Sequence, residues 1–171
     1  MRFVLCVLLW RKNMKILIVS DTHGVHRNYD KVIEREGKID MLLHMGDIEG
    51  GELYIENTAG CPAYMVAGNC DFYSVLPDEE EVQIGDYKIL MTHGHRYYVA
   101  RGTELLKKEA EMRGAQIAMY GHTHVPDIDI EGDVKVINPG SLSFPRQDGR
   151  KSSYVIMHIE QGNIDFELKY V

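Results

Sequence analysis

The chain has 171 residues, of which 44% are hydrophobic, and its 26 acidic and 19 basic side chains give a net charge of −7. This length suits one globular domain with a sizeable core, and the negative charge argues against a protein that grips a nucleic-acid backbone over many phosphates. Three cysteines without a Cys-x-x-Cys pair are typical of a reducing compartment, so we expect a cytoplasmic protein.

The N-terminus carries an apolar run, residues 3–10, between Arg2 and Arg11. The run is shorter than the ~20 residues that a membrane-spanning helix needs. No small-residue cleavage site of a signal peptide follows it. We therefore expect residues 1–13 to be an extension, residues 14–171 to form the single domain, and no membrane to be involved.

The first half of the chain alternates apolar runs with helical segments. We predict strands over residues 15–19, 39–43 and 63–67, and helices over residues 28–36 and 52–57. Asn28 is a favourable N-cap for the first helix, and Gly37 is a favourable stop. The order strand–helix–strand–helix–strand predicts parallel strands with right-handed crossovers.

The second half is richer in hairpins. Gly85-Asp86 predicts a two-residue turn between strands 81–84 and 87–91, and Thr103 is a favourable N-cap for a helix over residues 103–113. Further strands are expected over residues 116–120, 128–130, 134–137, 153–159 and 164–169. We predict an α/β (α+β) protein with two packed mixed sheets flanked by helices.

Five short polar motifs each follow a predicted strand. They are Ser20-Asp21-Thr22-His23-Gly24, Gly46-Asp47, Gly68-Asn69-Cys70-Asp71, Thr92-His93-Gly94-His95 and Gly121-His122-Thr123-His124. Because the carboxyl ends of parallel strands lie together, we expect these side chains to meet along one edge of one sheet. Carboxylate, amide and imidazole groups are ligands for a pair of divalent metal ions. An isolated histidine is usually packed or solvated, and we interpret His26 and His158 in this way.

The motifs and their order resemble the calcineurin-like metallophosphoesterases, in particular their small single-domain bacterial and archaeal phosphodiesterase branch. The family pattern is D-x-H, G-D, G-N-H-D or -E, H, and G-H-x-H, and Asn138-Pro139-Gly140-Ser141 resembles the turn that follows it. The resemblance spans residues 14 to about 170 and implies a four-layer sandwich. Cys70 stands where many relatives have histidine. The small branch often has cysteine there, and the general acid therefore stays open.

The resemblance implies the ligand set: Asp21, His23 and His124 for one ion, Asn69, His93 and His122 for the other, and Asp47 as the bridge. Manganese is the metal that we expect, with iron, nickel, cobalt and zinc as alternatives. Two ions, two carboxylates and a bridging hydroxide sum to a charge of about +1, which favours a small phosphate ester as the substrate.

The implied activity is hydrolysis of small phosphodiesters, or monoesters, by a metal-bridging hydroxide, with Asp47, Asn69, Asp71 and His95 as catalytic residues. Asp71 either orients a ligand, accepts a proton, or is a turn residue on the solvent side. His95 contacts either a metal-bound imidazole or the substrate. We expect His44 to be packed or to support a metal ligand rather than to bind metal itself. We expect Arg146 to lie on the surface, although it could reach a substrate phosphate.

Three alternatives stay open. A non-catalytic protein-binding scaffold on the same fold is disfavoured because all seven ligands are present. A phosphoprotein phosphatase is disfavoured because the chain lacks the length for a protein-binding groove, and a nuclease is disfavoured by the charge. We expect a small phosphate ester as the partner, with no nucleic-acid polymer, and a homo-oligomer stays open.

Overall fold

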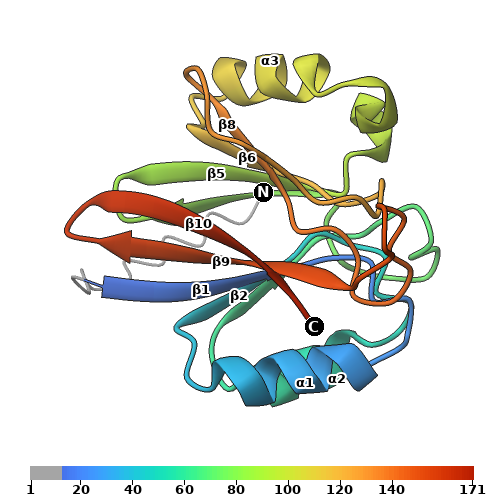
Figure 1. Cartoon of the computed structure of the whole chain (residues 1–171). Helices are drawn as coiled ribbons and strands as arrows, with labels where there is room; N and C mark the ends of the chain where they lie inside the picture. The colour runs from blue at the N-terminus through green and yellow to red at the C-terminus, as the bar shows by residue number, and fades with distance from the viewer. Residues whose placement is uncertain (1–12) are drawn as a thin grey trace.

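The computed structural model describes residues 13–171, which form two packed β-sheets between two layers of helices (Figure 1). The first sheet has the order β10-β9-β1-β2-β3 and the second the order β4-β5-β6-β8-β7. The strands of the first are β1 (Asn13–Val19), β2 (Met41–His44), β3 (Ala63–Met65), β9 (Ser153–Glu160) and β10 (Asn163–Tyr170). Those of the second are β4 (Glu79–Ile84), β5 (Tyr87–Thr92), β6 (Ile117–Met119), β7 (Asp127–Asp129) and β8 (Lys135–Asn138).

Helices α1 (Arg27–Glu36) and α2 (Glu52–Ala59) lie outside the first sheet, and α3 (Glu104–Met112) lies outside the second (Figure 1). Two 3₁₀ turns, η1 (His95–Tyr97) and η2 (Val99–Arg101), link β5 to α3. These layers confirm the predicted sandwich of two mixed sheets flanked by helices. No helix in residues 13–171 is long and apolar enough to span a membrane.

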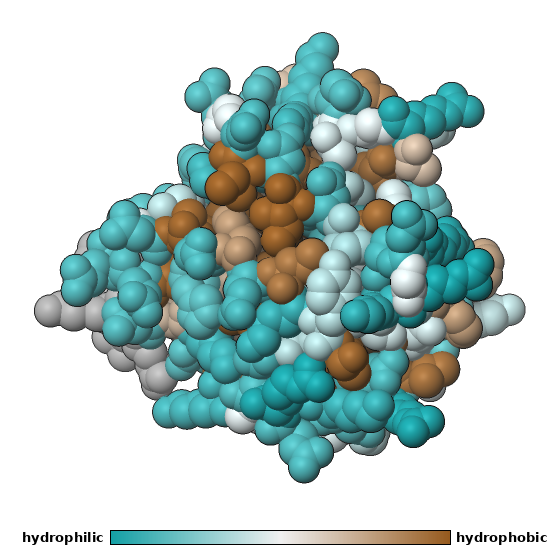
Figure 2. Space-filling view, in the orientation of Figure 1, coloured by the Kyte–Doolittle hydropathy of each residue, from teal (hydrophilic) through white to brown (hydrophobic). Residues whose placement is uncertain are grey.

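Alternate residues of the central strands fill different parts of the core. In β1, Ile16 and Ile18 pack between the sheets, whereas Leu17 and Val19 pack under α1 and α2. Both faces of this strand are therefore buried, which explains its continuous apolar sequence. In the space-filling view, apolar side chains gather over the seam between the sheets, and hydrophilic side chains cover most of the remaining face (Figure 2).

The direction of the strands brings the polar motifs together. Strands β1, β2 and β3 are parallel in the first sheet, and β5, β6 and β8 are parallel in the second. One expectation is wrong: the motifs do not share one sheet. Asp21 and Asp47 follow strands of the first sheet, whereas His93 and His122 follow strands of the second. The site therefore lies where the carboxyl ends of two sheets meet.

Several element ends differ from the prediction. Asn28 lies inside α1, and its amide donates hydrogen bonds to the Leu142 carbonyl and the Ser152 hydroxyl instead of capping the helix. Asn13, predicted to belong to the extension, already pairs with Glu160 as the first residue of β1. The prediction for residues 1–12 lies outside the described part of the chain.

Candidate metal centre

The predicted ligands lie in loops with unusual backbone geometry. Five of them have left-handed backbone angles: Asp21 (φ 53°), His23 (φ 46°), Asp47 (φ 53°), His122 (φ 66°) and His124 (φ 60°). Residues with side chains seldom adopt this conformation, and it costs on the order of 1 kcal/mol or more for each residue. Such geometry recurs at functional sites, where it aims a side chain that regular structure would turn elsewhere.

Glycines allow these loops to approach one another. A Cβ atom on Gly68 would overlap the Asp47 carboxylate, and one on Gly121 would overlap the Ser20 hydroxyl and crowd Asp21. Backbone hydrogen bonds then join the loops, from Asp21 N to the Gly46 carbonyl at 3.0 Å and from Gly121 N to the His93 carbonyl at 3.1 Å. Hydrogen bonds therefore join the loops within each sheet, and the close approach of Gly121 to Ser20 brings the loops of the two sheets together.

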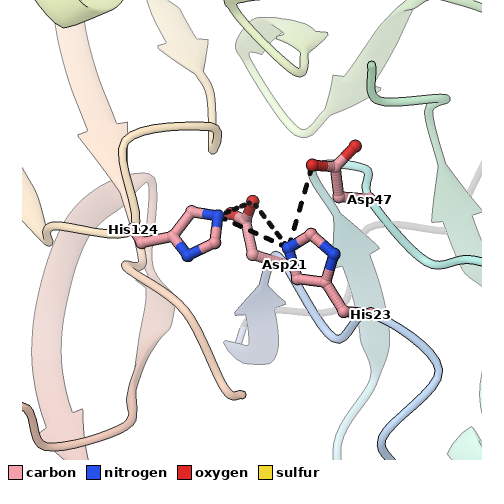
Figure 3. Close-up of side chains that lie close together, drawn as sticks. All are labelled: Asp21, His23, Asp47 and His124. Atoms are coloured by element: carbon pink, nitrogen blue, oxygen red, sulfur yellow. Dashed lines mark hydrogen bonds and ion pairs between the residues drawn. The ribbon is translucent and has the colours of Figure 1, made fainter. Parts of the chain in front are cut away.

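Asp21, His23, Asp47 and His124 converge in the centre of the site, with one ligand atom from each within 4.8 Å of the others (Figure 3). His124 Nε2 lies 3.0 Å from Asp21 Oδ1, and His23 Nε2 lies 3.8 Å from oxygens of both Asp21 and Asp47. Both carboxylates are buried. These four residues include the predicted ligands of the first ion together with the predicted bridge.

The other ring nitrogen of each central histidine is fixed by an acceptor. His23 Nδ1 lies 2.7 Å from Glu49 Oε1, and His124 Nδ1 lies 2.7 Å from the Phe144 carbonyl. His93 Nδ1 likewise lies 2.7 Å from the Met45 carbonyl. Carboxylate and carbonyl oxygens only accept hydrogen bonds, so each Nδ1 carries the proton. In the neutral rings, each Nε2 therefore presents a lone pair.

These lone pairs face electron-rich atoms. His93 Nε2 is 3.3 Å from Asp47 Oδ2, and the Nε2 atoms of His23 and His124 are 3.4 Å apart. Both carboxylate oxygens of Asp21 and His93 Nε2 are buried without a hydrogen-bond partner. Leaving such atoms without a partner is costly, and a cation among them would relieve the mutual repulsion. The residues thus fit a bound divalent metal ion.

The pKa values follow the same arrangement. Burial raises the pKa of Asp47, but His93 and the Cys70 backbone N–H lower it more strongly, to below its ordinary range. Burial lowers the pKa of His124, but Asp21 raises it to a net increase. The Asp47 carboxylate is therefore held in the charged form that binds metal ions.

The residues predicted for the second ion are spread more widely. His93 lies beside Asp47, and the His93 and His122 ring centroids are 5.3 Å apart. Asn69 is exposed, and its amide nitrogen donates to Cys70 Sγ at 3.3 Å. The structure brings His93 and His122 to the rim of the central cluster, and the second ion stays a prediction.

The remaining candidates have distinct environments. Asp71 is buried rather than on the solvent side, and it accepts backbone hydrogen bonds from Ile48 and Glu49 at one oxygen and from Gly68 at the other. It therefore fixes the loops that carry Asp47 and Asn69, and its role in proton transfer stays a prediction. His95 is half-buried, and its ring centroid is 5.6 Å from that of His93.

His44 is packed below the site. It contacts the Thr22 hydroxyl at 3.1 Å and accepts a hydrogen bond from Gly46 N at 3.2 Å, and burial lowers its pKa to about 3. Arg146 has an exposed side chain, and its backbone N–H donates to the His124 carbonyl.

The sequence reasoning missed the groups that orient the histidines. Glu49 holds His23, and the Met45 and Phe144 carbonyls hold His93 and His124. Backbone acceptors leave no trace in a sequence. The one available signal for Glu49 is its position two residues after Asp47, because metal-bound histidines commonly hydrogen-bond to a carboxylate.

Known proteins are similar to this chain in sequence and in fold. A probable metallophosphoesterase of Bacillus subtilis, YsnB, is 35% identical over 86% of this chain and 85% of its own. A probable metallophosphoesterase of Methanocaldococcus jannaschii is 34% identical over 78% of this chain and 70% of its own. The Escherichia coli phosphodiesterase YfcE is 26% identical over 82% of this chain and 85% of its own.

Among solved structures, a predicted phosphoesterase of Streptococcus pneumoniae is 31% identical, with a TM-score of 0.80 over 94% of this chain and 91% of that chain. Vps29 of Entamoeba histolytica, at 24% identity, shares the fold with a TM-score of 0.75 over 92% of this chain and 99% of that chain. A profile of the calcineurin-like phosphoesterase superfamily domain matches residues 14–162. The chain therefore belongs to the calcineurin-like phosphoesterase superfamily.

Proposed function

We propose that this protein hydrolyses small phosphodiesters with two divalent metal ions. The observation that supports the proposal best is the arrangement of three histidines, each locked with a protonated Nδ1 and a free Nε2 lone pair beside a buried carboxylate. When the imidazole rings are neutral, no hydrogen can bridge an Nε2 lone pair and the carboxylate that it faces. A cation between them can bind both. The name of the E. coli relative, a phosphodiesterase, supports the choice of diesters.

In this proposal Asp21, His23 and His124 hold the first ion, Asn69, His93 and His122 hold the second, and Asp47 is shared. When bound, the ions would supply an activated water for attack on phosphorus and would offset the charge on the phosphate oxygens. The protein's own part is to keep this geometry, and Glu49 and Asp71 do so through the hydrogen bonds described above. His95, half-buried near His93, is the side chain that we assign to contact with the substrate phosphate.

The test is turnover by purified full-length protein loaded separately with manganese, iron, nickel, cobalt or zinc. The substrates are bis-p-nitrophenyl phosphate, p-nitrophenyl phosphate and a cyclic nucleotide. We expect metal-dependent hydrolysis of the diester above that of the monoester, and its loss in Asp21→Asn, which removes one buried charge at nearly constant volume. A wild-type protein that holds two ions but turns over none of these substrates would refute the proposal.

A second candidate is a protein-binding scaffold, and the fold shared with Vps29 favours it. One solved form of that protein, at a TM-score of 0.66, is a zinc complex, so metal binding alone does not separate the two candidates. Turnover does separate them, because a scaffold needs no nucleophile. A metal-loaded protein without esterase activity would favour the scaffold.

A further inference from the structure

Phe144 is an aromatic side chain that covers the metal centre on one side. Its ring lies edge-on to the His23 imidazole, with the centroids 5.2 Å apart. Its carbonyl oxygen holds His124 Nδ1 at 2.7 Å. The residue thus contacts two predicted ligands of the first ion, yet 54% of it is exposed to solvent.

The loop that carries Phe144 is fixed at several points. Phe144 N donates to Ser141 Oγ at 2.9 Å, and that hydroxyl donates to the Asp21 carbonyl at 2.9 Å. Ser143 Oγ donates to the Thr22 carbonyl at 2.7 Å. The backbone of this loop is therefore held in place beside the Asp21 and His23 loop, and about half of the Phe144 surface stays exposed to solvent.

We propose that the exposed face of Phe144 binds the organic group of the phosphate ester and selects substrates in which this group is aromatic or otherwise flat and apolar. This rests on the proposed phosphoesterase function. In that proposal the phosphate binds beside His23, and the Phe144 ring, whose centroid is 5.2 Å from that of the His23 imidazole, is an aromatic neighbour of this position. Two other residues predicted for the site, His95 and Asn69, are half-buried and exposed, respectively, and both are polar. Phe144 thus offers an exposed apolar surface in contact with His23.

A pair of aromatic rings in contact gains about 0.5–1.5 kcal/mol beyond burial of their area, which corresponds to roughly threefold to tenfold in affinity. An alkyl group of one carbon cannot make this contact. The contribution of Phe144 to selection is therefore measured as a ratio of binding affinities. The two ligands compared share the phosphoryl group and differ only in the organic substituent.

The experiment measures the binding of phenylphosphonate and methylphosphonate to the manganese-loaded full chain by calorimetry, which needs no turnover. Wild type is expected to prefer phenylphosphonate by roughly threefold to tenfold. Phe144→Ala should remove most of this preference, and Phe144→Leu, which keeps His23 covered, should lower it in part. Leu105→Ala is the matched control, because Leu105 on α3 is 55% exposed and lies outside the site.

Metal content is measured on each variant, so that disturbance of His23 is detected. An unchanged preference in Phe144→Ala or Phe144→Leu at full metal content would overturn the proposal and leave the esterase function standing. If the metal-loaded wild type binds neither phosphonate, the anion site itself is wrong and both proposals fail.

Discussion

The carboxylate of Glu49 accepts a hydrogen bond of 2.7 Å from His23 Nδ1 and thereby turns the opposite ring nitrogen toward Asp21 and Asp47. Glu49 lies just beyond Asp47, and its own backbone N–H is held by Asp71 at 2.7 Å. The predicted ligand His23, its partner Glu49 and the predicted bridge Asp47 are thus parts of one connected network.

Replacing Glu49 should weaken the first metal ion without unfolding the protein. In Glu49→Gln the side chain keeps its size but loses the charge that fixes the tautomer and orientation of the His23 ring. Removal of such partners typically lowers metal affinity by about 10–100-fold. A chelator-competition titration measures this, with Glu56→Gln, an exposed side chain on α2, as the control. Equal affinities in wild type and Glu49→Gln would show that the hydrogen bond does not orient the ligand.

Asp47→Asn and His23→Ala should differ in how many ions they release. Asp47 Oδ2 lies 3.3 Å from His93 Nε2 and 3.8 Å from His23 Nε2, between the two predicted ligand sets. Loss of its charge should therefore weaken both ions, whereas His23→Ala should spare the second. Elemental analysis after gel filtration counts the ions. Release of a single ion by Asp47→Asn would contradict the shared role.

Cys70→His should accelerate esters that have poor leaving groups. Burial and the nearby Asp47 carboxylate raise the pKa of the Cys70 thiol to about 12, so it is a weak proton donor. An alkoxide leaving group needs a proton, whereas a nitrophenolate leaves unaided, and general acid catalysis is typically worth ~10²–10⁴ in rate. The measurement is the turnover ratio of two diesters that differ only in leaving-group pKa, at equal metal content. An equal effect on both would mean that this position does not face the leaving group, and Asp71 or His95 would become the candidates.

The stability at low pH should depend on Glu36, which is remote from the metal centre. Its buried carboxylate contacts Lys15 at 2.7 Å, Lys169 at 2.8 Å and the Tyr154 hydroxyl at 2.6 Å. Burial alone would raise the pKa of Glu36, but these three partners lower it to about 2. Because the folded pKa lies below the unfolded value of ~4.3, the carboxylate stabilises the fold above pH ~4.3 by on the order of 3 kcal/mol.

That stabilisation is lost as the pH falls from about 4 toward 2. Urea unfolding at pH 7 and pH 3, with chelator present throughout, should show a larger loss for wild type than for Glu36→Gln. The exposed Glu34→Gln on the same helix should behave as wild type. A Glu36→Gln protein with the same pH dependence as wild type would rule out this contribution.

The sequence predicted the strands well wherever both faces are buried. Residues 16–19 form the buried part of β1 because every side chain there meets a core, whichever way it points. It predicted the start of α1 less well, because the Asn28 amide binds residues 114 and 124 positions away, a tertiary contact that local capping rules cannot anticipate. The 3₁₀ turns after Gly94 also lacked a signal, since residues 95–101 have no helical period.

The candidate ligands were predictable because each stands directly after an apolar strand. Which sheet each strand would join was not, because strand order along the chain is compatible with one sheet or two. The pairing of β5 with β6, and not with β3, is decided by packing between distant segments. The acceptors that orient the histidines were missed because two of the three are main-chain carbonyls.

The left-handed backbone lowers the stability of the fold at the same positions that carry the predicted metal ligands. These positions are Asp21, His23, Asp47, His122 and His124. Glycine adopts this conformation without the steric cost that a side chain bears there. In a lineage that ceased to use the metal ions, glycine at Asp21 or His124 would relieve strain and remove a buried charge or ring at once. Loss of the metal ligands would then leave the free energy of unfolding unchanged or increased. The fold could therefore be kept for a different function.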